Sequence, residues 1–86
     1  MLTINIRLFA LYRERLQKSQ IHLMVPDGST VEDVTNQLSQ EYPKIGLLIK
    51  HTAIAVNEEY ADKSQILFQG DEMALLPPVS GGSQES

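Results

Sequence analysis

The sequence of 86 residues contains no cysteine and no tryptophan. Without cysteine the chain cannot form a disulfide, a thiolate zinc site or a catalytic cysteine nucleophile. Any sulfur chemistry in which this protein takes part must therefore use a group other than a cysteine side chain. The two histidines, His22 and His51, have no acidic residue at metal-ligand spacing, so we expect no metal site.

Basic residues and long apolar runs are also scarce. Eleven acidic residues outnumber seven basic ones, which gives a net charge of −4. This charge repels nucleic-acid phosphates and anionic lipid head groups, so we expect no nucleic acid and no membrane among the partners. No apolar run reaches the ~18–20 residues of a membrane span, and the N-terminal residues lack the pattern of a signal peptide. We therefore expect a cytoplasmic protein.

Catalytic motifs are missing as well. The chain has no Ser-His-Asp order, no P-loop and no dinucleotide fingerprint. Its length fits one small domain, which buries only a little over ~60% of its unfolded surface and for which partner binding is plausible. We expect a chain that is no enzyme on its own, binds no cofactor itself and works with other proteins.

What the sequence does contain is a regular alternation of apolar and polar residues. Such alternation, or a short apolar run bounded by turn residues, predicts strands over 2–9, 20–25, 53–57 and 73–79. The intervening residues 10–18 are predicted as a short helical turn or a loop, because an isolated helix of that length is marginal. Residues 43–51 are predicted as an irregular connection.

One main helix is expected over residues 30–42. Ser29 and Glu32 have the spacing of a capping box, in which each side chain accepts from the other residue's backbone N–H. An apolar stripe at spacings of three and four follows, and Pro43 ends it. The stripe consists of Val31, Val34, Leu38 and Tyr42.

This order of elements is typical of an α+β fold. It suits a four- to five-stranded mixed sheet packed on one main helix, the pattern of a ubiquitin-like β-grasp, although periodicity alone also suits other small α+β folds. We expect the β-grasp domain to cover residues 1–79. Residues 80–86, which contain the Gly-Gly pair, are predicted to form a flexible tail.

An ordered set of motifs in the C-terminal half resembles a known family. Gly70-Asp71-Glu72 precedes a short apolar strand, and Pro77-Pro78-Val79-Ser80-Gly81-Gly82 follows it near the C-terminus. The opening INIRLFA and the later AVN match as well. Over nearly all of residues 1–82 the chain resembles the molybdopterin synthase small subunits, which are sulfur carriers of the ubiquitin-like class.

The resemblance implies a specific role for the arm that follows the last strand. An ATP-dependent activating enzyme, an adenylyltransferase, would adenylate the Gly82 carboxylate, and sulfur would then replace one oxygen to give a thiocarboxylate. The large catalytic subunit would use this sulfur on a pterin precursor. Gly81 and Gly82 carry no side chain, so they can pass a narrow channel. The residues expected to contact the partner are Leu76, Pro77, Pro78, Val79 and Ser80. Met73 and Leu75 are predicted to face the core, whereas Ala74 and Leu76 face outward.

Four residues, SQES, follow Gly82, so its carbonyl is part of an amide. Three explanations are open: a processing peptidase removes residues 83–86, cloning added them, or the chain has lost the carrier role. Two other functions also remain open. One is a sulfur carrier for thiamin thiazole synthesis, and the other is a ubiquitin-like modifier or interaction module.

Overall fold

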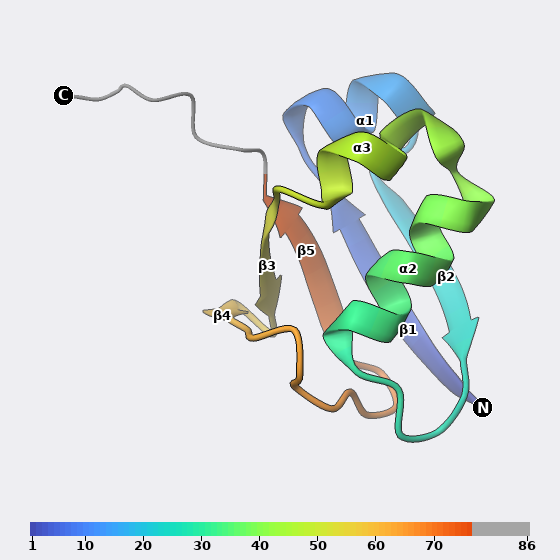
Figure 1. Ribbon diagram of the computed structural model, residues 1–86, viewed down its shortest axis with the longest axis vertical. Coiled ribbons are helices and arrows are strands. Elements are labelled where there is room, and N and C mark those ends of the chain that lie inside the picture. The colour runs from blue at the N-terminus through green and yellow to red at the C-terminus, as the bar shows by residue number, and fades with distance from the viewer. Residues whose placement is uncertain (77–86) are drawn as a thin grey trace, which may run out of the picture.

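The computed structural model describes residues 1–76, and predictions that concern residues 77–86 lie outside it. Helical segments follow each of the first two strands, and three further strands end the described part of the chain (Figure 1). The elements are β1 (Leu2–Leu8), α1 (Ala10–Leu16), β2 (Gln20–Val25), α2 (Val31–Glu41), the 3-10 helix η1 (Pro43–Ile45), α3 (Gly46–Ile49), β3 (Ala53–Val56), β4 (Glu59–Tyr60) and β5 (Glu72–Leu76). No helix within the described part of the chain is long and apolar enough to cross a membrane.

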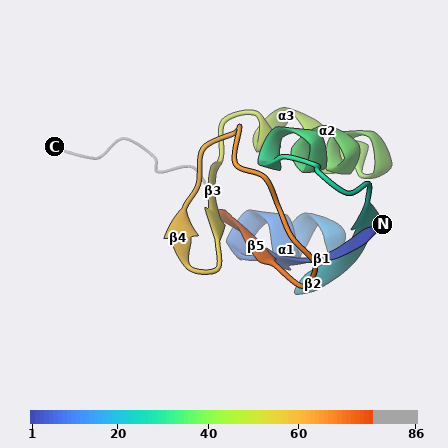
Figure 2. The same ribbon diagram turned by 90° about the horizontal axis from the view of Figure 1, so that it is seen from below.

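The strands form one mixed sheet in the order β2-β1-β5-β3-β4. β1 lies antiparallel to β2 but parallel to β5, and β5 pairs antiparallel with β3. The helices α2 and α3 lie on one side of this sheet (Figure 2). The predicted mixed sheet packed on one main helix is therefore confirmed.

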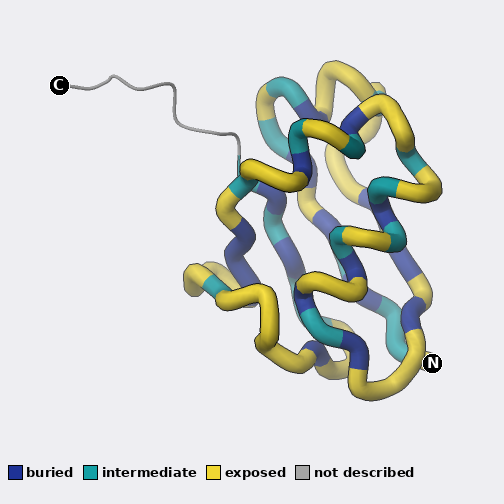
Figure 3. Tube along the Cα trace, viewed as in Figure 1, coloured by how far each residue is buried: buried dark blue, intermediate teal, exposed yellow. Residues whose placement is uncertain are grey.

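The core lies between the sheet and α2. Each long strand buries every second residue, and the buried positions line the layer between sheet and helices (Figure 3). The helix contributes the stripe Val31, Val34 and Leu38. The strands contribute Ile4, Ile6, Leu8, Ile21, Leu23, Val25, Met73 and Leu75. The predicted core positions in the last strand are thus confirmed.

The capping box of α2 differs from the predicted one. The Thr30 hydroxyl accepts from the Asp33 N–H at 3.2 Å, and the Asp33 carboxylate accepts from the Thr30 N–H at 3.0 Å. The prediction of Ser29 with Glu32 is wrong by one residue. Ser29 is instead buried, and its hydroxyl donates to the Pro26 carbonyl at 2.7 Å, so it belongs to the preceding turn.

Removing this cap has a measurable cost. We expect Thr30→Ala to lower the free energy of unfolding by about 1 kcal/mol, because the Asp33 N–H loses its acceptor. The control is Glu32→Ala, which removes the carboxylate of the wrong prediction and costs at most about 0.5 kcal/mol. Urea unfolding of both variants measures the difference. A larger loss for Glu32→Ala would contradict the observed cap.

Three further segments differ from the prediction. Residues 43–51, predicted as irregular, contain η1 and α3. The two-residue strand β4 was not predicted, and the last strand begins one residue earlier, at Glu72. Residues 10–16, left open between helix and loop, form α1, which Tyr12 fixes by burying its side chain in the core.

Candidate functional site

The sheet face opposite α2 is the candidate binding surface, since no helix of the described residues covers it (Figure 2). A shallow cavity of about 360 Å³ lies on this face beside the end of β5. We call this surface the outer face and define it by the residues that line the cavity. They are Arg7, Phe9, Ala55, Glu58, Tyr60, Glu72, Ala74 and Leu76.

Small side chains form the floor of the outer face. Ala55 and Ala74 lie opposite each other in the β3–β5 pair, so a partner can come close to the backbone of the sheet there. Tyr60 stands at the edge with 81% of its surface exposed. An exposed aromatic ring beside a flat apolar floor is a common feature of protein interfaces.

Charged groups at the rim are held in place. The Arg7 guanidinium lies 5.2 Å from the ring centroid of Phe9 and 3.7 Å from a Glu72 carboxylate oxygen. The Asn5 amide donates to the other Glu72 oxygen at 3.5 Å. A half-exposed ion pair adds at most about 1 kcal/mol to stability. Its main consequence is to orient one positive and one negative group at the rim.

The outer face contains only part of the predicted partner-binding set. Ala74 and Leu76 line it, as the alternation predicts, whereas Met73 and Leu75 are buried on the other side. The remaining predicted site residues lie outside the described residues. These are Pro77, Pro78, Val79, Ser80, Gly81 and Gly82.

The Gly70-Asp71-Glu72 motif has a structural role next to this face. Gly70 adopts a φ of 83°, which favours glycine. The Asp71 carboxylate accepts from the Phe68 N–H at 2.9 Å and from the Asn57 amide at 3.0 Å, while the Glu72 N–H donates to the Asn57 side-chain oxygen at 3.1 Å. The motif thus ties the β3–β4 turn to the start of β5.

At the other end of β5, side chains hold the root of the arm. Leu76 pairs with Ala53 in the sheet, and the Thr52 hydroxyl donates to the Leu76 carbonyl. Tyr12 of α1 is fully buried, and its hydroxyl makes no hydrogen bond within residues 1–76. Burial raises the pKa of Tyr12 above its ordinary value of 10.0, and the nearby Thr52 side chain partly opposes the rise.

This shift predicts a loss of stability in alkali. The raised pKa means that Tyr12 ionises at a lower pH in the unfolded chain than in the folded one. The stabilisation that comes from keeping Tyr12 un-ionised is therefore complete below pH 10.0. It is lost as the pH rises through the pKa that Tyr12 has in the folded protein. We expect the free energy of unfolding to fall between about pH 8 and about pH 11 by more in the wild type than in Tyr12→Phe. Tyr60→Phe is the control, because Tyr60 is exposed, and its free energy of unfolding should fall by as much as that of the wild type. Equal curves for wild type and Tyr12→Phe would contradict the shift.

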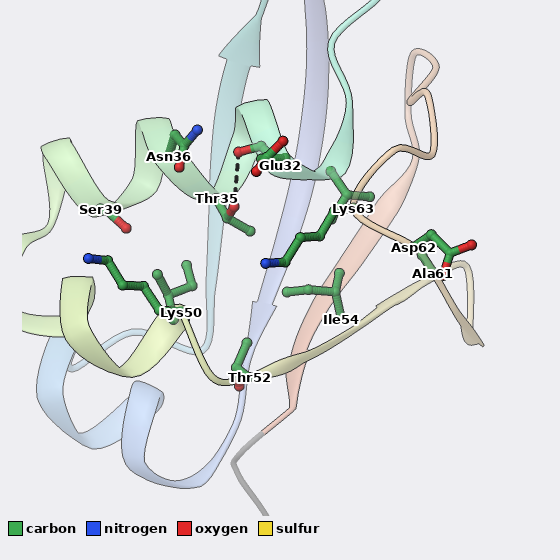
Figure 4. Close-up of a pocket in the computed structure, with 12 residues that line it drawn as sticks. Glu32, Thr35, Asn36, Ser39, Lys50, Thr52, Ile54, Ala61, Asp62 and Lys63 are labelled. Carbon is green, nitrogen blue, oxygen red and sulfur yellow. Dashed lines mark hydrogen bonds between the residues drawn. The ribbon is translucent and has the colours of Figure 1, made fainter.

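A second hollow, of about 530 Å³, lies on the helix side between α2 and residues 61–63. The ammonium groups of Lys50 and Lys63 border it, and Thr35 and Thr52 lie on opposite sides of it (Figure 4). Leu76, the predicted site residue that the structure describes, does not line this hollow.

Potential metal ligands do not gather anywhere in residues 1–76, where no group of three His, Asp or Glu side chains could hold an ion. His22 and His51 are both exposed and far apart in the chain. The expected absence of a metal site stays a prediction for the whole protein.

Comparison with known proteins identifies the family. Residues 6–82 match the model of the ThiS family. The chain belongs to the ThiS family. The predicted resemblance to ubiquitin-like sulfur carriers is confirmed by curated relatives. The molybdopterin synthase sulfur carrier subunit of Arabidopsis thaliana is 35% identical over 92% of this chain and 82% of that protein. The subunit of the same name from Dictyostelium discoideum is 38% identical over 91% of this chain and 94% of that protein.

A solved structure of another protein shares the fold. The small archaeal modifier protein 1 of H. volcanii superimposes with a TM-score of 0.84 and 25% identity, over 92% of this chain and 100% of that one. The predicted β-grasp is therefore confirmed by structure as well as by topology.

Proposed function

We propose that this ThiS-family chain is the sulfur carrier subunit of a molybdopterin synthase. The observation that carries the proposal is the similarity to curated carrier subunits over nine-tenths of the chain, with a family match that runs to residue 82. Gly82 is the second glycine of the pair, where the carrier chemistry requires a free carboxylate. The bond after Gly82 must therefore be cleaved, and we assign this step to a processing peptidase.

The chemistry then takes place at the end of the arm. A Gly82 carboxylate oxygen attacks the α-phosphate of ATP on the activating enzyme, pyrophosphate leaves, and an acyl-adenylate forms. Hydrosulfide attacks the acyl carbon, the bond to the AMP oxygen breaks, AMP leaves, and loss of the sulfur-bound proton gives the thiocarboxylate. This chain supplies the acyl group, whereas its partners supply catalysis and the ATP site. Such a division of labour suits a protein without cysteine, because the sulfur is carried on the backbone.

The outer face supports a docking role for the large catalytic subunit. It lies beside the last described residue of β5, so a partner bound there is placed next to the start of the arm. Its floor is flat and apolar and its rim is charged, as in the core and rim of protein interfaces. The net charge of −4 would favour approach to a basic surface around the partner's active site.

Co-purification tests this assembly. The chain ending at Gly82 is expressed together with the host's large subunit, and native mass spectrometry measures the product. We expect a stable hetero-oligomer. A carrier that stays monomeric at all concentrations and salt conditions would contradict the proposal.

A second function, protein modification, is favoured by the likeness to the archaeal modifier. A modifier uses the same activated glycine but transfers its acyl group to a lysine amine of another protein, with loss of AMP or a thiol. The two functions differ in their products. Chains linked to lysines through Gly82 would indicate a modifier, and a gene deletion that abolishes the pterin cofactor while sparing thiamin synthesis would indicate the carrier.

A further inference from the structure

The sheet has two edges, and only one of them is protected against pairing with another chain. β4 forms one edge, has only two residues, and begins with the acidic pair Glu58-Glu59. A short edge strand with charged side chains resists the addition of a further strand. β2 forms the other edge with six residues, none of which is Lys, Arg, Asp, Glu or Pro. Within residues 1–76 only β1 pairs with β2, so its other side is an open edge (Figure 1).

The hydrogen bonds of β1 show which of its residues bond to β2. The Asn5 N–H donates to the Asp71 carbonyl at 3.0 Å, so the backbone groups of Asn5 point toward β5 and away from β2. The Leu8 N–H donates to the Ser19 carbonyl at 2.9 Å. Since the direction alternates along a strand, the even positions of β1 bond to β2 and the odd positions bond to β5.

The backbone groups on the open edge of β2 follow from this alternation. Ile21, Leu23 and Val25 lie opposite even positions of β1, so their backbone groups point to β1. The other residues of the strand direct their N–H and C=O groups to the open edge. They are Gln20, His22 and Met24. The Met24 carbonyl agrees with this direction, because it accepts from the Gln37 amide of α2 at 3.1 Å.

We propose that β2 pairs antiparallel with β2 of a second copy of this chain, around a two-fold axis beside His22. His22 then lies opposite His22 of the second copy, and Gln20 lies opposite Met24. Each facing pair exchanges two hydrogen bonds. A register shifted by two residues would leave one of the three open residues of each strand without a facing partner. The Met24 carbonyl has a second lone pair, so it can keep its bond to Gln37.

Charge complementarity indicates that a second copy occupies this edge. Lys18 lies two residues before β2, and Asp27 lies two residues after it. Because the two strands run in opposite directions, Lys18 of each copy comes next to Asp27 of the other. Both residues are exposed, and Asp27 also holds the N-terminal ammonium group of its own chain at 3.0 Å. The pairing thus forms an ion pair at each end of a strand that itself has no Lys, Arg, Asp or Glu.

The pairing also covers an exposed apolar side chain. Met24 exposes 57% of its surface, and the methylene groups of Gln20 of the second copy would lie against it. The outer face stays free, because β1 separates β2 from β5. A paired chain therefore keeps the surface proposed for the large subunit.

Disulfide trapping tests the pair, because the chain has no cysteine of its own. Facing residues of a hydrogen-bonded antiparallel pair have Cα atoms about 5.5 Å apart, a distance that a disulfide spans. In the 86-residue chain under a mild oxidant, His22→Cys should form a linked dimer at least about ten-fold faster than His51→Cys. His51 is the matched control, since it is also an exposed histidine but lies outside the sheet. Equal rates for the two variants would overturn the pair.

Cysteines elsewhere in the strand test the register. Gln20 lies opposite Met24 of the second copy, and neither residue faces its own equivalent. Gln20→Cys alone and Met24→Cys alone should therefore link no faster than His51→Cys. A mixture of the two variants should form the mixed disulfide at least about ten-fold faster than either variant links with itself. Faster linkage of either variant with itself than with the other would overturn the proposed register.

His22→Pro tests the backbone hydrogen bonds. The His22 N–H points away from β1, and proline is tolerated on an edge strand at such a position. Each dimer loses two N–H donors, so the dissociation constant from sedimentation equilibrium should rise at least about ten-fold. His22→Val keeps the N–H and should change the constant less than about three-fold. An unchanged constant for His22→Pro would overturn the pair, and if this variant fails to fold, the disulfide rates decide.

The charge contacts are tested by reversal. Lys18→Glu should weaken pairing about five-fold, and adding Asp27→Lys to the same chain should restore it, because the ion pairs form again with opposite signs. No restoration would overturn these contacts. A wild-type chain that stays monomeric up to about 1 mM would overturn the proposal as a whole and leave the edge to a strand of another protein. No carrier reaction enters these measurements, so their outcome is independent of the proposed function.

Discussion

Ala74→Arg is expected to weaken binding to the large subunit by about 100-fold, or about 2.7 kcal/mol. Ala74 lies on the floor of the outer face between β1 and β3, where an arginine would hold a partner away from the sheet. It would also add a positive charge to a surface expected to meet a basic partner. Because the side chain points away from the core, the fold should tolerate the change.

His22→Arg is the control for this prediction. His22 is exposed on β2, where it pairs with Asn5 on the same side of the sheet but two strands away from Ala74. The His22→Arg substitution adds the same positive charge at a position outside the cavity. Calorimetric titration of both variants with the large subunit should show a loss of affinity for Ala74→Arg alone. Equal affinities for the two variants would place the partner elsewhere.

Leu75→Ala should produce the largest loss of stability. Leu75 is 0% exposed in the core, and truncating such a leucine leaves a cavity that costs about 3 kcal/mol. In a domain of this size the midpoint of thermal unfolding would fall by at least about 12 °C.

The neighbouring Leu76→Ala is the matched control, because the same atoms are removed from the outer face. We expect it to cost at most about 1 kcal/mol of stability while reducing affinity for the partner. Calorimetric melting of both variants separates the two faces of β5. Similar losses from both substitutions would contradict the alternation on which the site is built.

The strands of this fold were predictable where one face is buried. A buried face requires apolar residues at every second position, and such a period is visible in β1, β2 and the last strand. The same alternation correctly separated Met73 and Leu75 from Ala74 and Leu76. It failed for β4, because two residues are too few to show any period.

Helical segments were predictable only when long. The stripe of α2 extends over three turns, whereas α3 has four residues and gains its helical state from packing against α2. The cap was misplaced because Ser29 and Thr30 both have an acidic residue three positions later. The Pro26 carbonyl accepts a hydrogen bond from the Ser29 hydroxyl, so the Thr30 hydroxyl is the one that caps the helix.

Much of the site depends on strand order and could not be inferred locally. Arg7 and Phe9 reach the outer face because β1 lies parallel beside β5, a pairing between residues more than sixty positions apart. Tyr60 joins them through the unpredicted β4. The buried position of Tyr12 is equally non-local, since it depends on how α1 packs on the core.

The central claim is that Gly82 carries sulfur, and intact mass measurement tests it most directly. Chains ending at Gly82 and at Ser86 are incubated with the host's activating enzyme, ATP and a sulfur donor. We expect the shorter chain to gain the mass difference of one oxygen replaced by sulfur. The 86-residue chain should stay unmodified until it is cleaved after Gly82, and Gly82→Val in the shorter chain should abolish the product, because its side chain obstructs a narrow channel. Modification of the longer chain at Ser86, or a shorter chain that no activating enzyme of its host modifies, would contradict the account.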